Sequence, residues 1–78
     1  MISDIAVRFG KAIRRIRRQA GISQEELAER CGLHRTYVSD VELGKRNVSL
    51  ENIERFSQSL NMSLADLFME VDKNEGIS

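Results

Sequence analysis

Apolar residues recur at three- and four-residue intervals along most of the chain, the periodicity of helices with one buried face. The first such stripe consists of Ile5, Phe9, Ala12, Ile13 and Ile16. It predicts a helix over residues 4–19. Proline is absent and strand-like alternation is rare. The pattern therefore favours an all-α fold.

Glycine and serine divide the rest of the pattern into short helices. Gly21 is suited to end the first helix, because glycine adopts a left-handed conformation at little cost. Ser23 followed by Glu26 forms a capping box that begins a second helix. Gly32 permits a sharp turn before a third helix over about 35–42.

Two further serines, Ser49 and Ser63, are the predicted caps of a fourth and a fifth helix. The last helix has an apolar stripe formed by Leu64, Leu67, Phe68 and Val71. The sequence thus predicts a compact five-helix bundle. Its single domain covers residues 1–72, and residues 73–78 are expected to be a flexible tail.

Two of these predicted helices form the most informative arrangement in the chain. Residues 23–47 read SQEELAERCGLHRTYVSDVELGKRN. They predict two short helices joined by a tight turn, with polar residues on one side of the second. This is the layout of a helix-turn-helix, whose second helix enters the major groove of DNA. A DNA-binding protein of this kind needs no catalytic residues.

The net charge is zero, but the charges are unevenly distributed. Residues 1–50 hold ten basic and six acidic side chains, a net +4, whereas residues 51–78 hold two basic and six acidic, a net −4. Such asymmetry suits a protein that turns one face to phosphate, although an ordinary solvated helix face is the alternative.

Cysteine usage and hydropathy limit where the protein works. A single cysteine excludes a disulfide within the chain and fits the reducing cytoplasm, where we expect this protein. No apolar run approaches the roughly 20 residues needed to span a membrane, so no membrane association is expected.

Neither a metal site nor an active site is predicted. The three-residue spacing of Cys31 and His34 suggests a metal site, but zinc needs four ligands and the chain has no second cysteine or histidine. Cys31 is interpreted as a core residue. The acidic residues Glu25, Glu26 and Glu29 are interpreted as a solvated face, with an activator's contact to RNA polymerase as the alternative. No nucleophile–base pair or phosphate loop appears, so we expect no enzyme and no cofactor.

A family resemblance supports this interpretation. The pattern IRxxR…GISQEELAERCGL…VSDVELGKRNVSLENIERFSQSL…SLADLF, over residues 13–68, resembles the Cro and phage-repressor type of helix-turn-helix. Within it, HRTYVSDVELGKRNVSL most resembles the controller proteins of restriction-modification systems. The resemblance implies a small dimeric regulator of its own gene and an endonuclease gene, activating at one occupancy and repressing at a higher one. A phage-type repressor or an antitoxin-type autorepressor is the alternative.

Base reading is assigned to the start of the third helix. The predicted base-reading residues are Arg35, Thr36, Tyr37 and Asp40. The planar guanidinium group of Arg35 can donate two hydrogen bonds to the O6 and N7 atoms of guanine. Many phage repressors have glutamine here, so Arg35 and Thr36 favour guanine over adenine. Tyr37 packing against the second helix is an alternative. Asp40 is expected to orient Arg35, with a hydrogen bond from a cytosine amino group as its alternative.

Contacts with the DNA backbone are expected around this helix. The predicted residues are Arg17, Ser23, Gln24, His34, Ser39, Lys45, Arg46 and Asn47. Gln24 resembles the family's phosphate-binding glutamine at a helix N-terminus, where amides favour an anion. Arg17 resembles a phosphate clamp, and a surface ion pair with Glu42 is its alternative.

The last helix, about 63–71, is the expected dimerisation element. Its apolar surface exceeds what the end of a small domain buries easily, so we expect a homodimer on a pseudo-palindromic double-stranded DNA operator. The predicted interface residues are Met62, Leu64, Leu67, Phe68 and Val71. A protein-interaction module that uses this helix is the competing functional class.

Overall fold

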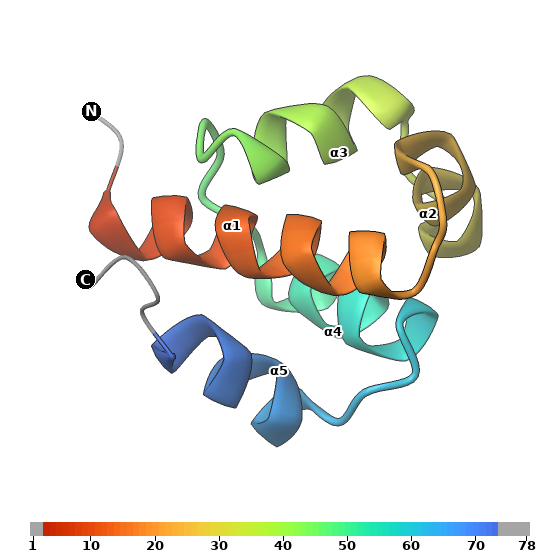
Figure 1. The fold of residues 1–78 in the computed structure, drawn as a ribbon. Coiled ribbons are helices and arrows are strands. Elements are labelled where there is room, and N and C mark those ends of the chain that lie inside the picture. Colours follow the sequence, from red (N-terminus) through yellow and green to blue (C-terminus); the bar gives the residue numbers. More distant parts are fainter. Residues whose placement is uncertain (1–2, 74–78) are drawn as a thin grey trace.

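The computed structural model describes residues 3–73, and these form five helices and no strand (Figure 1). The helices are α1 Asp4–Gln19, α2 Gln24–Cys31, α3 Arg35–Glu42, α4 Leu50–Ser59 and α5 Leu64–Asp72. The predicted all-α class is therefore confirmed. The expected tail, apart from Lys73, lies outside the described residues. None of the described helices has the length and apolar character needed to cross a membrane.

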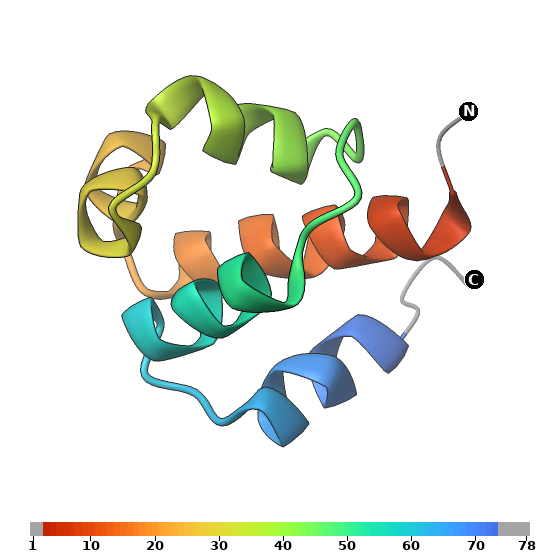
Figure 2. The same cartoon turned by 180° about the vertical axis from the view of Figure 1, so that it is seen from behind.

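Helix α1 crosses the middle of the molecule and has neighbours on both sides (Figures 1 and 2). It packs against α3 on one side and α5 on the other. Helix α2 packs against both α3 and α4, which closes the end of the bundle farther from the start of α1 and the end of α5. The recognition helix expected from the sequence, α3, thus lies at one edge of the molecule with its outer side uncovered.

Serine caps explain where four of the helices begin. The hydroxyls of Ser3, Ser23, Ser49 and Ser63 each accept a hydrogen bond from the backbone amide three residues later. The capping box is only half formed, because the carboxylate of Glu26 pairs with Arg30 at 2.7 Å. Helix α3 is the exception: His34 precedes it and makes no side-chain cap hydrogen bond.

The core lies between α1 and the other four helices. Its largest fully buried side chains are Phe56, Ile13, Leu27, Leu67, Val38 and Val41. The rings of Phe9 and Phe56 meet edge to face, with centroids 6.0 Å apart. Val38 and Val41 are the inner side of α3, so burial of this side fixes which side of the recognition helix faces outward.

Gly10 allows α1 and α3 to approach each other closely. A Cβ atom at this position would overlap the carbonyl oxygen of Val41 and lie 2.9 Å from that of Glu42. Both neighbours are backbone atoms, which cannot rotate away as a side chain can. The missing side chain of Gly10 therefore sets the distance between α1 and the end of α3.

Gly10→Ala should destabilise the protein by about 1–3 kcal/mol, because the added methyl group forces the two helices apart. Helix propensity alone predicts the opposite sign, a gain of about 1 kcal/mol for alanine over glycine. Urea unfolding followed by circular dichroism measures the difference. Gly21→Ala is the comparison: Gly21 has φ 75° but open space around a Cβ, so only backbone strain is added. A Gly10→Ala variant as stable as the parent would contradict the close-approach argument.

Candidate nucleic-acid interface

A tight turn sets the geometry of α2 and α3. Gly32 has φ 70°, and the amide of Leu33 donates to the carbonyl of Ala28 at 2.9 Å, which closes the end of α2. The chain then enters α3 after only three residues. Because its inner valines are buried, α3 presents Arg35 and Thr36 to solvent.

The start of α3 lies beside the start of α2. An open hollow is lined by Arg17, Ser23, Gln24, Glu25 and Arg35. Three residues predicted as DNA-backbone contacts thus lie around the same hollow as the predicted base reader Arg35. Helix N-termini supply unpaired amides that favour an anion.

Tyr37 is half-buried and held by two contacts. Its hydroxyl oxygen accepts a hydrogen bond from Asn52 Nδ2 at 3.1 Å, and the guanidinium carbon of Arg46 lies 5.4 Å from its ring centroid. These neighbours come from α4 and the loop after α3, not from α2, the packing partner considered from the sequence. Since the hydroxyl oxygen only accepts in this contact, its proton remains available for a base or phosphate. Asn52 was not expected to support the site.

Asp40 does not orient Arg35, contrary to the sequence interpretation. Its Oδ2 lies 3.4 Å from Nη2 of Arg46. Five residues separate Asp40 from Arg35, so the two side chains point about 140° apart around the helix axis. Asp40 instead faces the loop that follows α3, where it holds a predicted backbone contact.

Arg17 is a largely buried residue held by an ion pair rather than an open phosphate clamp, which corrects the sequence interpretation. Its Nε and Nη2 donate to the two carboxylate oxygens of Glu42 at 2.6 and 3.1 Å. Nη1 donates to the carbonyl of Ile22 at 2.9 Å. The side chains of Arg17 and Glu42 are only 12% and 2% exposed, so the ion pair is largely shielded from water, and Arg17 reaches only the edge of the hollow described above.

The same carboxylate positions Gln24. Its Nε2 donates to Oε1 of Glu42 at 3.0 Å. An amide nitrogen carries two hydrogens, so one remains for a phosphate while the other anchors the side chain. Glu42 therefore joins α1, the start of α2 and the end of α3.

The loop after α3 contributes side chains that differ in how firmly they are held. Lys45 is exposed, and the Arg46 side chain is half-exposed with its contacts to Asp40 and Tyr37. Asn47 Oδ1 accepts a hydrogen bond from the Ser3 hydroxyl at 3.3 Å, which ties the loop to the start of α1. Ser39 is half-buried and His34 is exposed.

Cys31 belongs to the core, as the sequence predicted. It is 5% exposed, and burial raises the pKa of its thiol. The group is therefore kept as a neutral thiol, a poor nucleophile and metal ligand.

The predicted dimer residues fall into two groups. Leu67 and Val71 are 0% and 2% exposed within one chain, so assigning them to a dimer surface was wrong. They are the inner side of α5, which the core needs for its own closure. Phe68 and Leu64 are 37% and 43% exposed, whereas Met62 is partly buried against the core.

This arrangement of a packed α2, a glycine turn and an α3 with a polar outer side is that of a helix-turn-helix DNA-binding protein. The helix-turn-helix family matches residues 13–67, and the chain belongs to it. The protein is thus a DNA-binding transcription regulator.

The similar proteins include controllers of restriction-modification systems. The chain is 50% identical over 68 residues to control protein C.BamHI of Bacillus amyloliquefaciens, covering 86% of this chain and 84% of the relative. It is 42% identical over 73 residues to control protein C.MunI of a Mycoplasma species, covering 92% and 99%. Among solved structures, the controller protein C.AhdI of Aeromonas hydrophila matches with a TM-score of 0.78 at 46% identity, covering 81% and 96%.

Arg17→Met should destabilise the free protein by about 3–5 kcal/mol, because it leaves the buried carboxylate of Glu42 without its cation. Urea unfolding without DNA measures this loss. The matched control is Arg30→Met, which removes an arginine from an exposed ion pair with Glu26; a change within about 1 kcal/mol is expected there. Equal stability of Arg17→Met and the parent would contradict the structural role of Arg17 and favour the phosphate contact predicted from the sequence.

Proposed function

We propose that this protein is a restriction-modification controller that binds its operator as a homodimer and regulates its own gene and an endonuclease gene. The similarity to control proteins over most of the chain supports this assignment. At one occupancy of the operator it activates, and at a higher occupancy it represses. Such a regulator works in the cytoplasm, where the DNA and RNA polymerase are.

The observation that carries the proposal is the outer side of α3. Arg35 and Thr36 are exposed at its first turn, where the side chains of a recognition helix reach base edges. The Tyr37 hydroxyl is held beside them by Asn52. Bidentate donation by Arg35 to a guanine specifies one base pair, and Thr36 contacts its neighbour.

The bonds of Glu42 and Asp40 support the residues that bind the DNA backbone. Gln24 and Arg46 stand on either side of α3, one at the start of α2 and one in the loop after α3. Each is held by a carboxylate, Gln24 by Glu42 and Arg46 by Asp40. These contacts set the register of α3 in the major groove, while the bases are read by α3 itself.

The dimer surface that we propose is the exposed apolar part of α5 and α1. Phe68 and Leu64 belong to it, together with Ile5, which is 46% exposed. Phe68 and Ile5 also line a small apolar hollow of about 130 Å³ between α1, α4 and α5. A dimer formed through this surface buries apolar side chains that are exposed in one chain. The two α3 helices of such a dimer bind half-sites about 34 Å apart.

Selection of bound fragments from a genomic DNA library tests this function. A two-fold-related motif upstream of the protein's own gene and an endonuclease gene is expected. Arg35→Ala should weaken binding to the selected motif by about 1–3 kcal/mol per half-site and relax one base position in each, because each guanine loses a bidentate partner. Binding to random duplexes serves as the control. Equal loss on motif and random DNA would make Arg35 a phosphate contact, and absence of any motif would refute the operator proposal.

Phe68→Asp should convert the dimer to a folded monomer, because a carboxylate replaces an exposed ring at the proposed contact. Sedimentation velocity measures the mass, and circular dichroism checks the fold. Leu67→Asp is the matched control: it places the same charge one residue away in the core and should unfold the chain. A Phe68→Asp variant that is folded and still dimeric would remove Phe68 from the interface.

A further inference from the structure

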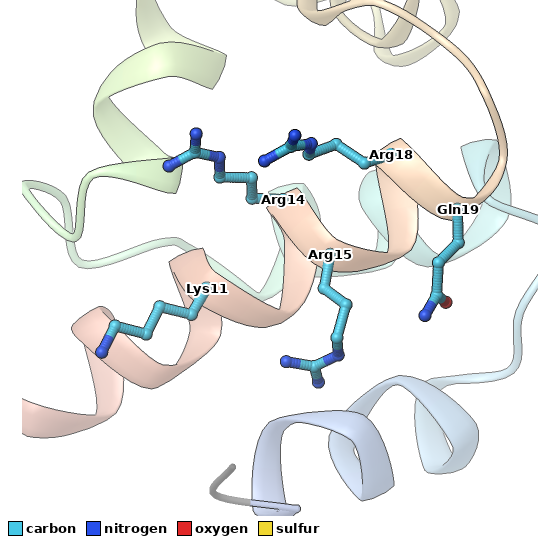
Figure 3. Close-up of a pocket in the computed structure, with 5 residues that line it drawn as sticks. All are labelled: Lys11, Arg14, Arg15, Arg18 and Gln19. Atoms are coloured by element: carbon cyan, nitrogen blue, oxygen red, sulfur yellow. The ribbon is translucent and has the colours of Figure 1, made fainter. Parts of the chain in front are cut away.

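A cluster of exposed basic residues lies on α1, outside the contacts that hold α2 and α3 together. Lys11, Arg14 and Arg18 are exposed along one side of this helix, and we refer to them as the α1 basic face. Together with Arg15 and Gln19 they line an open hollow (Figure 3). The spacing of three and four residues places them on one side of the helix.

Neighbouring arginines of the same helix are used by the fold, in contrast to this face. Arg15 donates to the carbonyl and the carboxylate of Glu70 at 2.9 and 3.3 Å, and Arg8 donates to Asp4 at 2.8 Å. The three side chains of the basic face make no hydrogen bond or ion pair within residues 3–73. Three like charges on one side of a helix repel one another and create a local positive field that attracts an anion.

The directions of the side chains indicate where that anion lies. Arg14 and Arg18 extend toward the α3 side of α1, whereas Arg15 and Gln19 extend toward α5 (Figure 3). Arg17, which follows Arg14 by three residues and is its neighbour on the surface of α1, lines the hollow that Gln24 and Arg35 share at the starts of α2 and α3. The edge of α1 that carries Arg14 and Arg18 is therefore continuous with the proposed DNA-binding surface.

We propose that Arg14 and Arg18 bind phosphates of the operator's sugar–phosphate backbone, extending the DNA interface from α2 and α3 onto α1. This inference rests on the proposed function. Their Cα atoms are about 6 Å apart along the helix axis, a separation that lets the two guanidinium groups reach neighbouring phosphates of one strand. An acidic protein segment would also satisfy the charges, but continuity with the α2–α3 surface favours DNA.

The test is the salt dependence of DNA binding by the double variant Arg14→Gln, Arg18→Gln. Each subunit of the proposed homodimer loses two phosphate contacts, so the slope of log K against log salt should fall by about 1.8 per subunit, or about 3.6 for the dimer. The preference for the operator over a random duplex should stay the same, because phosphate contacts carry no base information. Fluorescence anisotropy of both duplexes over a series of salt concentrations gives the slope and the preference.

Two matched controls separate position from charge. Arg30→Gln also removes a cation, but Arg30 lies at the end of α2 and donates to Glu26 and the carbonyl of Ser59; its slope should equal that of the parent. Lys11→Gln removes a cation of the same face whose side chain extends along α1 rather than toward α3, and it should change the slope less than Arg14→Gln (Figure 3).

An unchanged slope in the double variant would overturn the inference even if the parent binds its operator tightly. Unchanged DNA binding with lost transcription activation would likewise overturn it and assign the face to an acidic protein. If the parent selects no motif, the operator proposal fails separately. The slope on the random duplex then still decides whether Arg14 and Arg18 bind phosphate.

Discussion

The buried ion pair between Arg17 and Glu42 is the interaction on which the rest of the interface depends. Three helices meet at it, since Arg17 belongs to α1, Glu42 ends α3, and Gln24 of α2 donates to the same carboxylate. A buried pair often stabilises a fold no more than apolar residues of similar size would, whereas removing one partner is costly. The pair also fixes orientation, because both carboxylate oxygens accept bonds from Arg17 and one accepts a further bond from Gln24.

This orientation matters because α3 is too short to be stable as a helix without contacts from other parts of the fold. A helix of eight residues is unstable alone in water, so its position comes from its neighbours. Gly10 brings the α1 backbone against the end of α3, and the Asn52–Tyr37 hydrogen bond holds its first turn from α4. A recognition helix fixed at both ends meets the major groove with little loss of conformational entropy, and that favours affinity for the correct site.

The sequence predicted the helices well because their signals are local. A serine cap and an apolar stripe lie within a few residues of what they specify, and the predicted bounds of α1 and α3 agree with the structure. The errors concern contacts between distant residues. Arg17 and Glu42 are 25 residues apart, and no local pattern says whether that arginine meets phosphate or a carboxylate. Likewise the stripe on α5 shows that one side is apolar, but only packing against α1 shows that Leu67 is inside and Phe68 outside.

The pairing of charges also explains how a chain of zero net charge binds a polyanion. The acidic second half neutralises the α5 side of α1, where Arg8 approaches Asp72 and Arg15 pairs with Glu70. A hydrogen bond from Lys73 lowers the pKa of Glu70, which keeps this carboxylate charged and the pairing intact at neutral pH. Among the cations of α1, Arg14 and Arg18 have no acidic partner within residues 3–73, and they extend toward the α3 side (Figure 3). Phosphate responds to this local field and not to the total charge, since interactions beyond about 10 Å are largely screened at 0.1 M salt.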